Sequence, residues 1–124
     1  MIDALGYPIN ILISPSNRND CEFAINLLSK VNIEKGCLII ADKGYDTDAI
    51  LDYAYQHDAE PVIPSRSLRK HINRIDLHAY KERHLVENFF CKLKAFRRVA
   101  TRYDKTAHAF LGFVCLASVL IWLL

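Results

Sequence analysis

Glycine, proline and cysteine are scarce in this chain of 124 residues, which has 4 of each. So little glycine and proline excludes a fibrous or low-complexity protein, and 52% hydrophobic with 24% charged residues excludes a disordered one. No two of the cysteines are close enough in sequence for a zinc-type pair: Cys21, Cys37, Cys91 and Cys115. Because the sequence shows no secretory signal, we expect reduced thiols in a cytoplasmic protein, mostly filling its core.

A run of apolar residues long enough to cross a membrane is also lacking. The most apolar stretch, Phe110–Leu124, has no charged residue but is 15 residues long, whereas a membrane span needs about 20. We therefore expect a buried core helix, in which Gly112, Ala117 and Ser118 allow close packing. A membrane anchor that follows a basic region is the alternative.

The formal net charge is only +2, but the two halves of the chain differ in sign. Residues 1–60 contain 4 Lys and Arg against 10 Asp and Glu, whereas residues 61–105 contain 12 against 4. Such an asymmetry indicates that a polyanion, usually a nucleic acid, contacts the second half. A solvated basic face is the other interpretation.

Apolar runs and capping residues predict an α/β domain with parallel strands. Residues 3–6 resemble a hairpin turn, and three apolar segments predict strands at residues 9–13, 37–41 and 60–63. Helices are expected between these strands, beginning at Asn19 or Asp20 and at Asp46 or Thr47. The polar, basic residues 65–75 predict an exposed loop. A long helix over residues 77–99 and a last helix from Asp104 or Thr106 complete the chain.

Asp42 directly follows the second predicted strand, in the sequence Ala-Asp-Lys-Gly-Tyr-Asp. In α/β sheets, ligands bind beyond the carboxyl ends of the strands, where a carboxylate can hold a divalent cation. An aspartate that closes a turn or caps a helix is the other interpretation of the same position.

The long predicted helix carries two stripes. At 100° per residue, its polar stripe falls within about 60° and consists of Tyr80, Arg83, Glu87, Lys94 and Arg98. Roughly opposite lies an apolar stripe of Leu85, Val86, Phe89, Leu93, Phe96 and Ala100. One acid among cations is typical of an ion-paired surface, and also of a metal-binding glutamate beside residues that hold phosphates.

Five blocks of the sequence resemble the DDE transposases of bacterial insertion sequences. The residues Tyr80, Arg83, Glu87 and Lys94 match that family's Tyr-(2)-Arg-(3)-Glu-(6)-Lys signature in type and spacing. The other blocks follow in the family's order, at residues 3–6, 17–20, 41–46 and 97–105. The resemblance covers essentially the whole chain.

This resemblance implies a ribonuclease-H-like fold with a central mixed sheet flanked by helices. It implies a site in which three acids hold two Mg²⁺ ions, which activate water or a 3′-hydroxyl for attack on a DNA phosphodiester. By position, Asp42 and Glu87 match two of these catalytic, metal-binding acids. The residues that match those holding the DNA backbone near the transposon end are Tyr80, Arg83 and Lys94. We expect Arg97, Arg98 and Arg102 to extend this DNA contact, and a plain charged helix end is the other interpretation of these three arginines.

The family's first catalytic aspartate has no match in this sequence, since Asp3 corresponds to the turn after the second strand of the family's fold. The resemblance therefore implies one incomplete catalytic domain over residues 1–124, which lacks the first strand and is inactive alone. Expected partners are DNA ends, and the upstream half of a transposase or a full-length transposase. A non-enzymatic DNA-binding or regulatory module is the alternative function.

Overall fold

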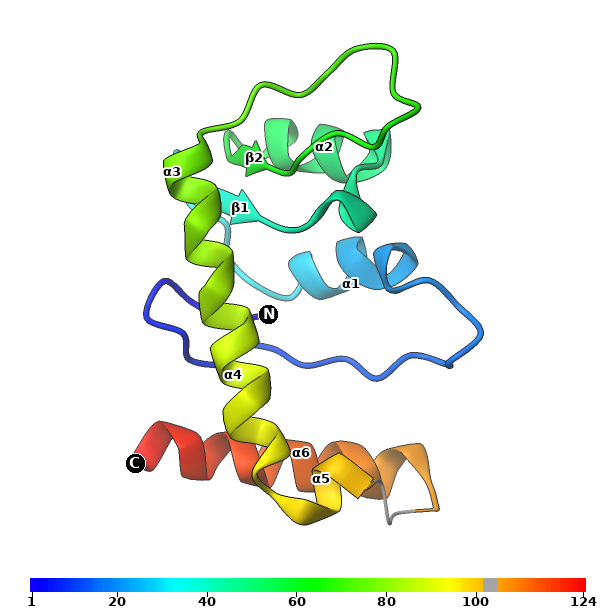
Figure 1. Ribbon diagram of the computed structural model, residues 1–124, viewed down its shortest axis with the longest axis vertical. Helices are drawn as coiled ribbons and strands as arrows, with labels where there is room; N and C mark the ends of the chain where they lie inside the picture. Colours follow the sequence, from blue (N-terminus) through cyan, green and yellow to red (C-terminus); the bar gives the residue numbers. More distant parts are fainter. Residues whose placement is uncertain (102–104) are drawn as a thin grey trace. The chain divides into compact units, whose positions relative to one another are not determined.

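A computed structural model describes residues 1–101 and 105–124 of the chain (Figure 1). The chain divides into two compact units. Unit 1 comprises Met1–Ile13 and His84–Leu124, and unit 2 comprises Ser14–Arg83. Each unit has a hydrophobic cluster of its own.

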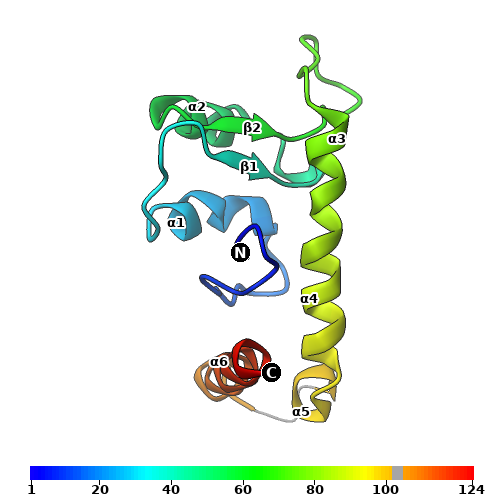
Figure 2. The ribbon, with the colours of Figure 1, turned by 90° about the vertical axis from the view of Figure 1, so that its left-hand side faces the viewer.

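Unit 2 is built on a parallel pair of short strands, β1 (Leu38–Ile40) and β2 (Glu60–Val62), which lie side by side in Figure 2. Leu38 pairs with Glu60 and Ile40 pairs with Val62. These strands confirm the second and third predicted strands and their parallel pairing. Their burial differs, because Val62 is fully buried whereas Leu38 keeps 44% of its surface exposed. The fold is thus a mixed α/β arrangement with a small two-stranded parallel sheet.

Helices in unit 2 begin close to where the sequence predicts them. The first consists of the 3₁₀ turn η1 (Asp20–Phe23) followed by α1 (Ala24–Leu28). The second, α2 (Asp48–Gln56), is capped by Thr47, whose side chain accepts a hydrogen bond from the Ile50 N–H at 3.3 Å. Helix α2 buries Ile50 and Leu51 against Ile63, which forms the core of this unit.

After β2, residues 64–76 form a long connection without helix or strand, as expected, which leads to α3 (Leu77–Tyr80) and the 3₁₀ turn η3 (Lys81–Arg83). Asp76 caps α3 by accepting hydrogen bonds from the N–H groups of His78 and Ala79. Helical residues therefore begin where the long helix is predicted.

The prediction of one unbroken helix over residues 77–99 is wrong. Helix α4 (His84–Lys94) follows η3 and ends at Lys94, and a separate helix, α5 (Arg97–Thr101), begins at Arg97. The break arises because the N–H groups of Ala95 and Phe96 bond to carbonyls three residues back, which tightens and closes the last turn of α4. A new turn then starts with the Val99 N–H donating to the Phe96 carbonyl.

Unit 1 has its core between these helices and α6 (Ala107–Leu123). Its buried residues are Phe89, Leu93, Val99, Val114, Ala117 and Ile121. Thr106 caps α6 by accepting from the Ala109 N–H at 3.2 Å, which agrees with one of the two predicted starts. The other, Asp104, lies outside the described residues. Ala117 and Ser118 are buried as expected, but Gly112 is exposed, and a Cβ atom added there would meet no atom of the described residues within 4 Å beyond the backbone of its own helix.

The N-terminal segment of unit 1 forms the predicted turn but not the predicted strand. Asp3 and Tyr7 are joined by a backbone hydrogen bond of 2.8 Å, and Gly6 takes a φ of +86°, which favours glycine. An isolated bridge pairs Ile2 with Pro8. Residues 9–13 do not form a strand, because no strand of the described residues pairs with them. Their β-branched composition favours an extended backbone but does not provide a neighbouring strand for hydrogen bonding.

The cysteines correct another expectation. Cys37, Cys91 and Cys115 are exposed, so these three do not fill the core, whereas the half-buried Cys21 packs against the hydrophobic cluster of unit 2. All four are free thiols. None of the helices formed by residues 1–101 and 105–124 combines the length and apolar character that crossing a membrane requires.

Candidate functional site

Asp42 stands at the carboxyl end of β1, where it begins the 3₁₀ turn η2 (Lys43–Tyr45). Its Oδ1 atom accepts a 2.8 Å hydrogen bond from the Gly44 N–H, and its side chain is exposed. The backbone before it is held by β2, because the Ala41 N–H donates to the Val62 carbonyl at 3.4 Å. The turn interpretation of Asp42 is therefore confirmed, and its exposed carboxylate also suits a cation.

A glycine at position 44 leaves room for the Asp42 carboxylate in its observed orientation. A Cβ atom at position 44 would lie 2.9 Å from Oδ1 of Asp42, closer than side-chain atoms normally come. The Asp-Lys-Gly order thus lets the backbone N–H at residue 44 fix the orientation of the Asp42 carboxylate.

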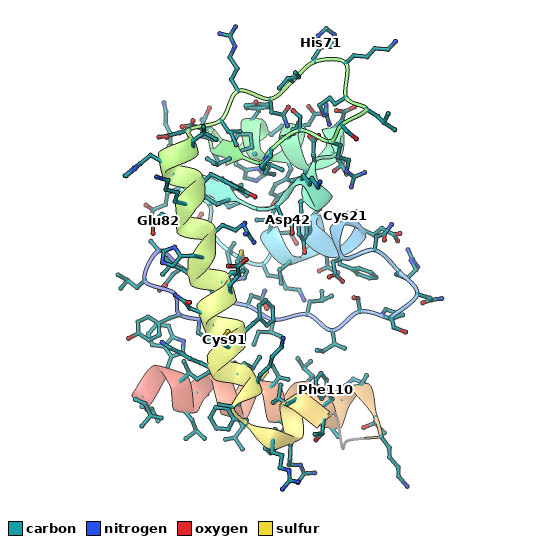
Figure 3. All side chains as sticks on the ribbon, in the orientation of Figure 1. Cys21, Asp42, His71, Glu82, Cys91 and Phe110 are labelled. Carbon is teal, nitrogen blue, oxygen red and sulfur yellow. The ribbon has the colours of Figure 1, made fainter. Side chains whose placement is uncertain are left out.

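A second acid lies in the same electrostatic neighbourhood. Burial raises the pKa of the Tyr45 hydroxyl, and the negative charges of Asp20 and Asp42 raise it further. Asp20 itself accepts a 3.2 Å hydrogen bond from the Ser14 hydroxyl. Figure 3 labels Asp42 beside Cys21, the neighbour of Asp20 in sequence. The sequence indicates Asp20 only as a candidate helix start and as part of a resembling block, and neither signal places it near Asp42.

Glu87 belongs to unit 1, in the first turn of α4, where the helix dipole favours an acid. The helix buries Phe89 and Leu93 and leaves Glu87 and Lys94 exposed. The predicted division of this helix into an apolar and a polar face is therefore confirmed within α4. Ala100, assigned to the apolar stripe, is instead exposed on α5.

The predicted DNA-contacting residues that the structure describes are spread over four helical elements, α3, η3, α4 and α5. Tyr80 and Arg83 lie in unit 2, where both are half-buried and the Arg83 guanidinium stands 5.8 Å from the centre of the Tyr80 ring. Arg97 and Arg98 lie exposed on α5, with the Arg98 guanidinium 5.1 Å from the ring centre of Phe113. Arg102 lies outside the described residues.

The two predicted metal-binding acids fall in separate units, Asp42 in unit 2 and Glu87 in unit 1. Across residues 1–101 and 105–124, no three His, Cys, Asp or Glu side chains gather so that they could hold a metal ion. That Asp42 and Glu87 share a cation therefore stays a prediction.

Asp46 is the most connected acid of unit 2, and the sequence analysis did not identify its role. Its side chain is fully buried. Oδ2 accepts hydrogen bonds of 2.8 Å from the Arg66 N–H and from Nε of Arg69, and Oδ1 accepts one of 2.9 Å from Nδ2 of Asn73. All three donors lie 20 or more residues away in sequence, so no local pattern could reveal them.

Burial alone would raise the pKa of Asp46, but the opposing interactions win. Hydrogen bonds from Arg69, Arg66 and Asn73, together with the charge of Arg69, lower the pKa of this carboxyl below its ordinary value. The same pairing, together with Asp48, raises the pKa of the Arg69 guanidinium. Asp46 is thus a buried, ionised anchor.

The segment tied to Asp46 is basic, and we call residues 65–75 the basic segment. It contains Arg66, Arg69, Lys70 and Arg74 and no acid. It stands out as the long loop between β2 and α3 in Figure 1, and Figure 3 places His71 at its outer bend. An open hollow of about 820 Å³ is lined by residues 66–71 of this segment and by Lys43, Gly44, Asp46 and Asp48.

Comparisons with known proteins agree with the resemblance seen in the sequence. The profile of a family described as "Transposase DDE domain" matches residues 1–122. The chain is 42% identical over 125 residues to a protein of Brucella ovis (strain ATCC 25840 / 63/290 / NCTC 10512) named "Putative transposase for insertion sequence element IS6501". That match covers 99% of this chain and 94% of the relative. No solved structure matches the chain.

Proposed function

The chain belongs to the transposase DDE domain family, and on that basis we propose that it acts on DNA in the transposition of an insertion sequence. The observation that carries this proposal is the family match over residues 1–122 together with the complete Tyr-Arg-Glu-Lys signature. The reaction that we propose is metal-dependent cleavage and transfer of DNA strands at the ends of the element. We place it in the cytoplasm, where DNA and reduced thiols are both found.

In this proposal, Asp42 and Glu87 are the catalytic, metal-binding residues of a ribonuclease-H-like domain that spans residues 1–124. Both are exposed carboxylates, and oxygen donors of this kind are what Mg²⁺ prefers. Asp42 is also fixed in orientation by the Gly44 N–H. When bound, a pair of Mg²⁺ ions activates the attacking oxygen and stabilises the leaving one.

The cations of the signature bind the DNA backbone rather than take part in the chemistry. Arg83 and Lys94, with Tyr80, position the strand, and Arg97, Arg98 and Arg102 extend the contact along it. A third acid of the site has no match in this sequence, so we propose that another transposase segment supplies it. The partner is the upstream half of a transposase or a full-length copy.

The proposal is tested by strand cleavage. The 124-residue chain is joined to, or mixed with, a transposase segment that carries the family's first aspartate, and duplex DNA with the element's ends is added with Mg²⁺. We expect cleavage that Asp42→Asn and Glu87→Gln each abolish. The matched controls are Asp52→Asn and Glu82→Gln, exposed acids of the same chain. Equal cleavage by the Glu87→Gln chain would refute the assignment.

A non-enzymatic DNA-binding module is the second candidate, favoured by the 12 Lys and Arg against 4 acids in residues 61–105. It predicts that Arg83→Ala weakens DNA binding while Asp42→Ala does not, and that affinity falls steeply with salt. Cleavage that depends on Asp42 would exclude this candidate, and binding that ignores salt would exclude it as well.

A further inference from the structure

We infer that the basic segment is a preformed contact surface for DNA backbone phosphates, in which Asp46 and Asn73 hold the base of the loop and Lys70 and Arg74 meet the DNA. This inference rests on the proposed function and adds a surface that lies outside the Tyr-Arg-Glu-Lys signature. It is carried by the way in which the cations of this segment divide into two roles.

The first role is structural. The Arg69 guanidinium is used inside unit 2, where Nε bonds to Asp46 and Nη1 bonds to Asp48 at 2.8 Å. Only 20% of the Arg69 side chain is exposed. Arg66 donates from Nε to the Lys43 carbonyl at 3.2 Å and from Nη2 to the Gly44 carbonyl. Arg66 therefore ties the segment to η2, and Arg69 ties it to Asp46 and to the start of α2.

Asn73 closes the loop from its far end. Its Nδ2 donates to the Ile63 carbonyl at 3.1 Å as well as to Asp46, and its backbone N–H donates to the Ser65 hydroxyl. Both ends of the basic segment are thus fixed to the end of β2 and to Asp46. A loop held at both ends loses less conformational entropy when it binds a ligand than a free one does.

The second role belongs to the remaining cations. Lys70 and Arg74 are exposed, and within the described part of the chain neither has an ion pair. Lys43, which is exposed and lines the hollow together with Lys70, adds a third charge. The two acids that line the hollow are already used, because Asp46 and Asp48 both pair with Arg69. A positive surface therefore remains, which suits the phosphates of a duplex.

The test measures binding of the 124-residue chain to a labelled duplex at several salt concentrations. For the double variant Lys70→Ala/Arg74→Ala, we expect weaker binding, equal for element ends and unrelated sequence, and a salt slope reduced by about 2. The charge-matched control is Lys30→Ala/Lys35→Ala, which removes two exposed lysines of unit 2 outside the segment. That control should leave the slope unchanged.

The outcomes separate this inference from the proposed function. If the chain binds DNA and the Lys70→Ala/Arg74→Ala variant keeps the full affinity and slope, the inference is overturned and the proposed function stands. If DNA binding falls with Leu68→Ala, which removes an exposed apolar side chain of the same loop, but not with the Lys70→Ala/Arg74→Ala variant, the loop meets DNA through an apolar contact and the inference about phosphates is overturned. If the chain binds no DNA at all, both fail.

Discussion

Replacing Asp46 by asparagine should release the basic segment from unit 2. The new amide keeps the size of the side chain and the oxygen that faces Asn73. Its NH₂ group, however, replaces the Oδ2 atom that accepts from the Arg66 N–H and from Arg69 Nε. Two donors then face another donor in a fully buried position, and the Arg69 charge loses its buried partner.

The size of the effect follows from these contacts. A hydrogen bond that involves a charged group contributes about 1.5–3 kcal/mol, and breaking a buried ion pair by removing one partner costs about 3–5 kcal/mol. Because Arg69 is 20% exposed, water screens part of that cost. We therefore expect Asp46→Asn to lower the free energy of opening of the basic segment by about 3 kcal/mol, so that the open form is populated about 100 times more often.

Limited trypsin digestion measures this opening, because the basic segment offers four cleavage sites, after Arg66, Arg69, Lys70 and Arg74. Cleavage of an opened segment follows the population of the open form when opening is fast. Mass spectrometry of the fragments should show these sites cut about 100 times faster in the Asp46→Asn chain. Lys35 is exposed in a turn of the same unit, so only a parallel rise in cleavage after Lys35 would indicate that the whole unit unfolds.

Asp48→Asn is the matched control. Asp48 also pairs with Arg69 at 2.8 Å, but 83% of its side chain is exposed, and such a pair contributes about 0–1 kcal/mol. The control should therefore change cleavage by less than about fivefold. If Asp46→Asn leaves the segment as resistant as Asp48→Asn does, Asp46 is not the anchor and the reasoning fails.

Three further predictions concern both units. Folding lowers the pKa of Asp46, so the ionised carboxylate contributes fully to stability at pH values above its ordinary pKa of 3.8. This contribution is lost as the pH falls through the lower pKa of the folded state. Urea unfolding followed by circular dichroism should show the loss in the wild type and not in Asp46→Asn. Gly44→Ala should turn the Asp42 carboxylate away and lower the free energy of unfolding by about 1 kcal/mol. Because both residues belong to the same hydrogen bond, adding Asp42→Ala should lower it no further, and additive losses in the double variant would contradict this. Trp122→Phe should cost about 1 kcal/mol, because it removes the 3.0 Å hydrogen bond from Nε1 to the Pro8 carbonyl, and an unchanged urea midpoint would disprove that contribution.

The elements predicted correctly are those whose signals are local. The strand at β1 lies between Gly36 and Asp42, and the start of α2 follows from the cap at Thr47. A capping hydrogen bond joins residues three apart, so the sequence around it contains the whole interaction. The family signature on residues 80–94 is local in the same sense, and it identified the family correctly.

The features that sequence reasoning missed depend on distant partners. Residues 9–13 have a strand-like composition, but a strand exists only where another strand pairs with it. The basic segment was expected to be a plain exposed loop, because its anchor, Asp46, lies about twenty residues earlier. Asp46 itself was assigned to the start of a helix. The break between α4 and α5 also escaped notice, since no proline or glycine marks it.

Trp122 is the single tryptophan of the chain, and it stacks on Tyr7 with 4.5 Å between ring centres. Both residues belong to unit 1, so the intrinsic fluorescence of the protein, excited at the indole, reports on unit 1 alone. Unfolding of unit 2 leaves this emission unchanged and has to be followed by a signal from the backbone amides of unit 2. Comparing the two signals during a single denaturant titration therefore shows directly whether the two units melt together or one after the other.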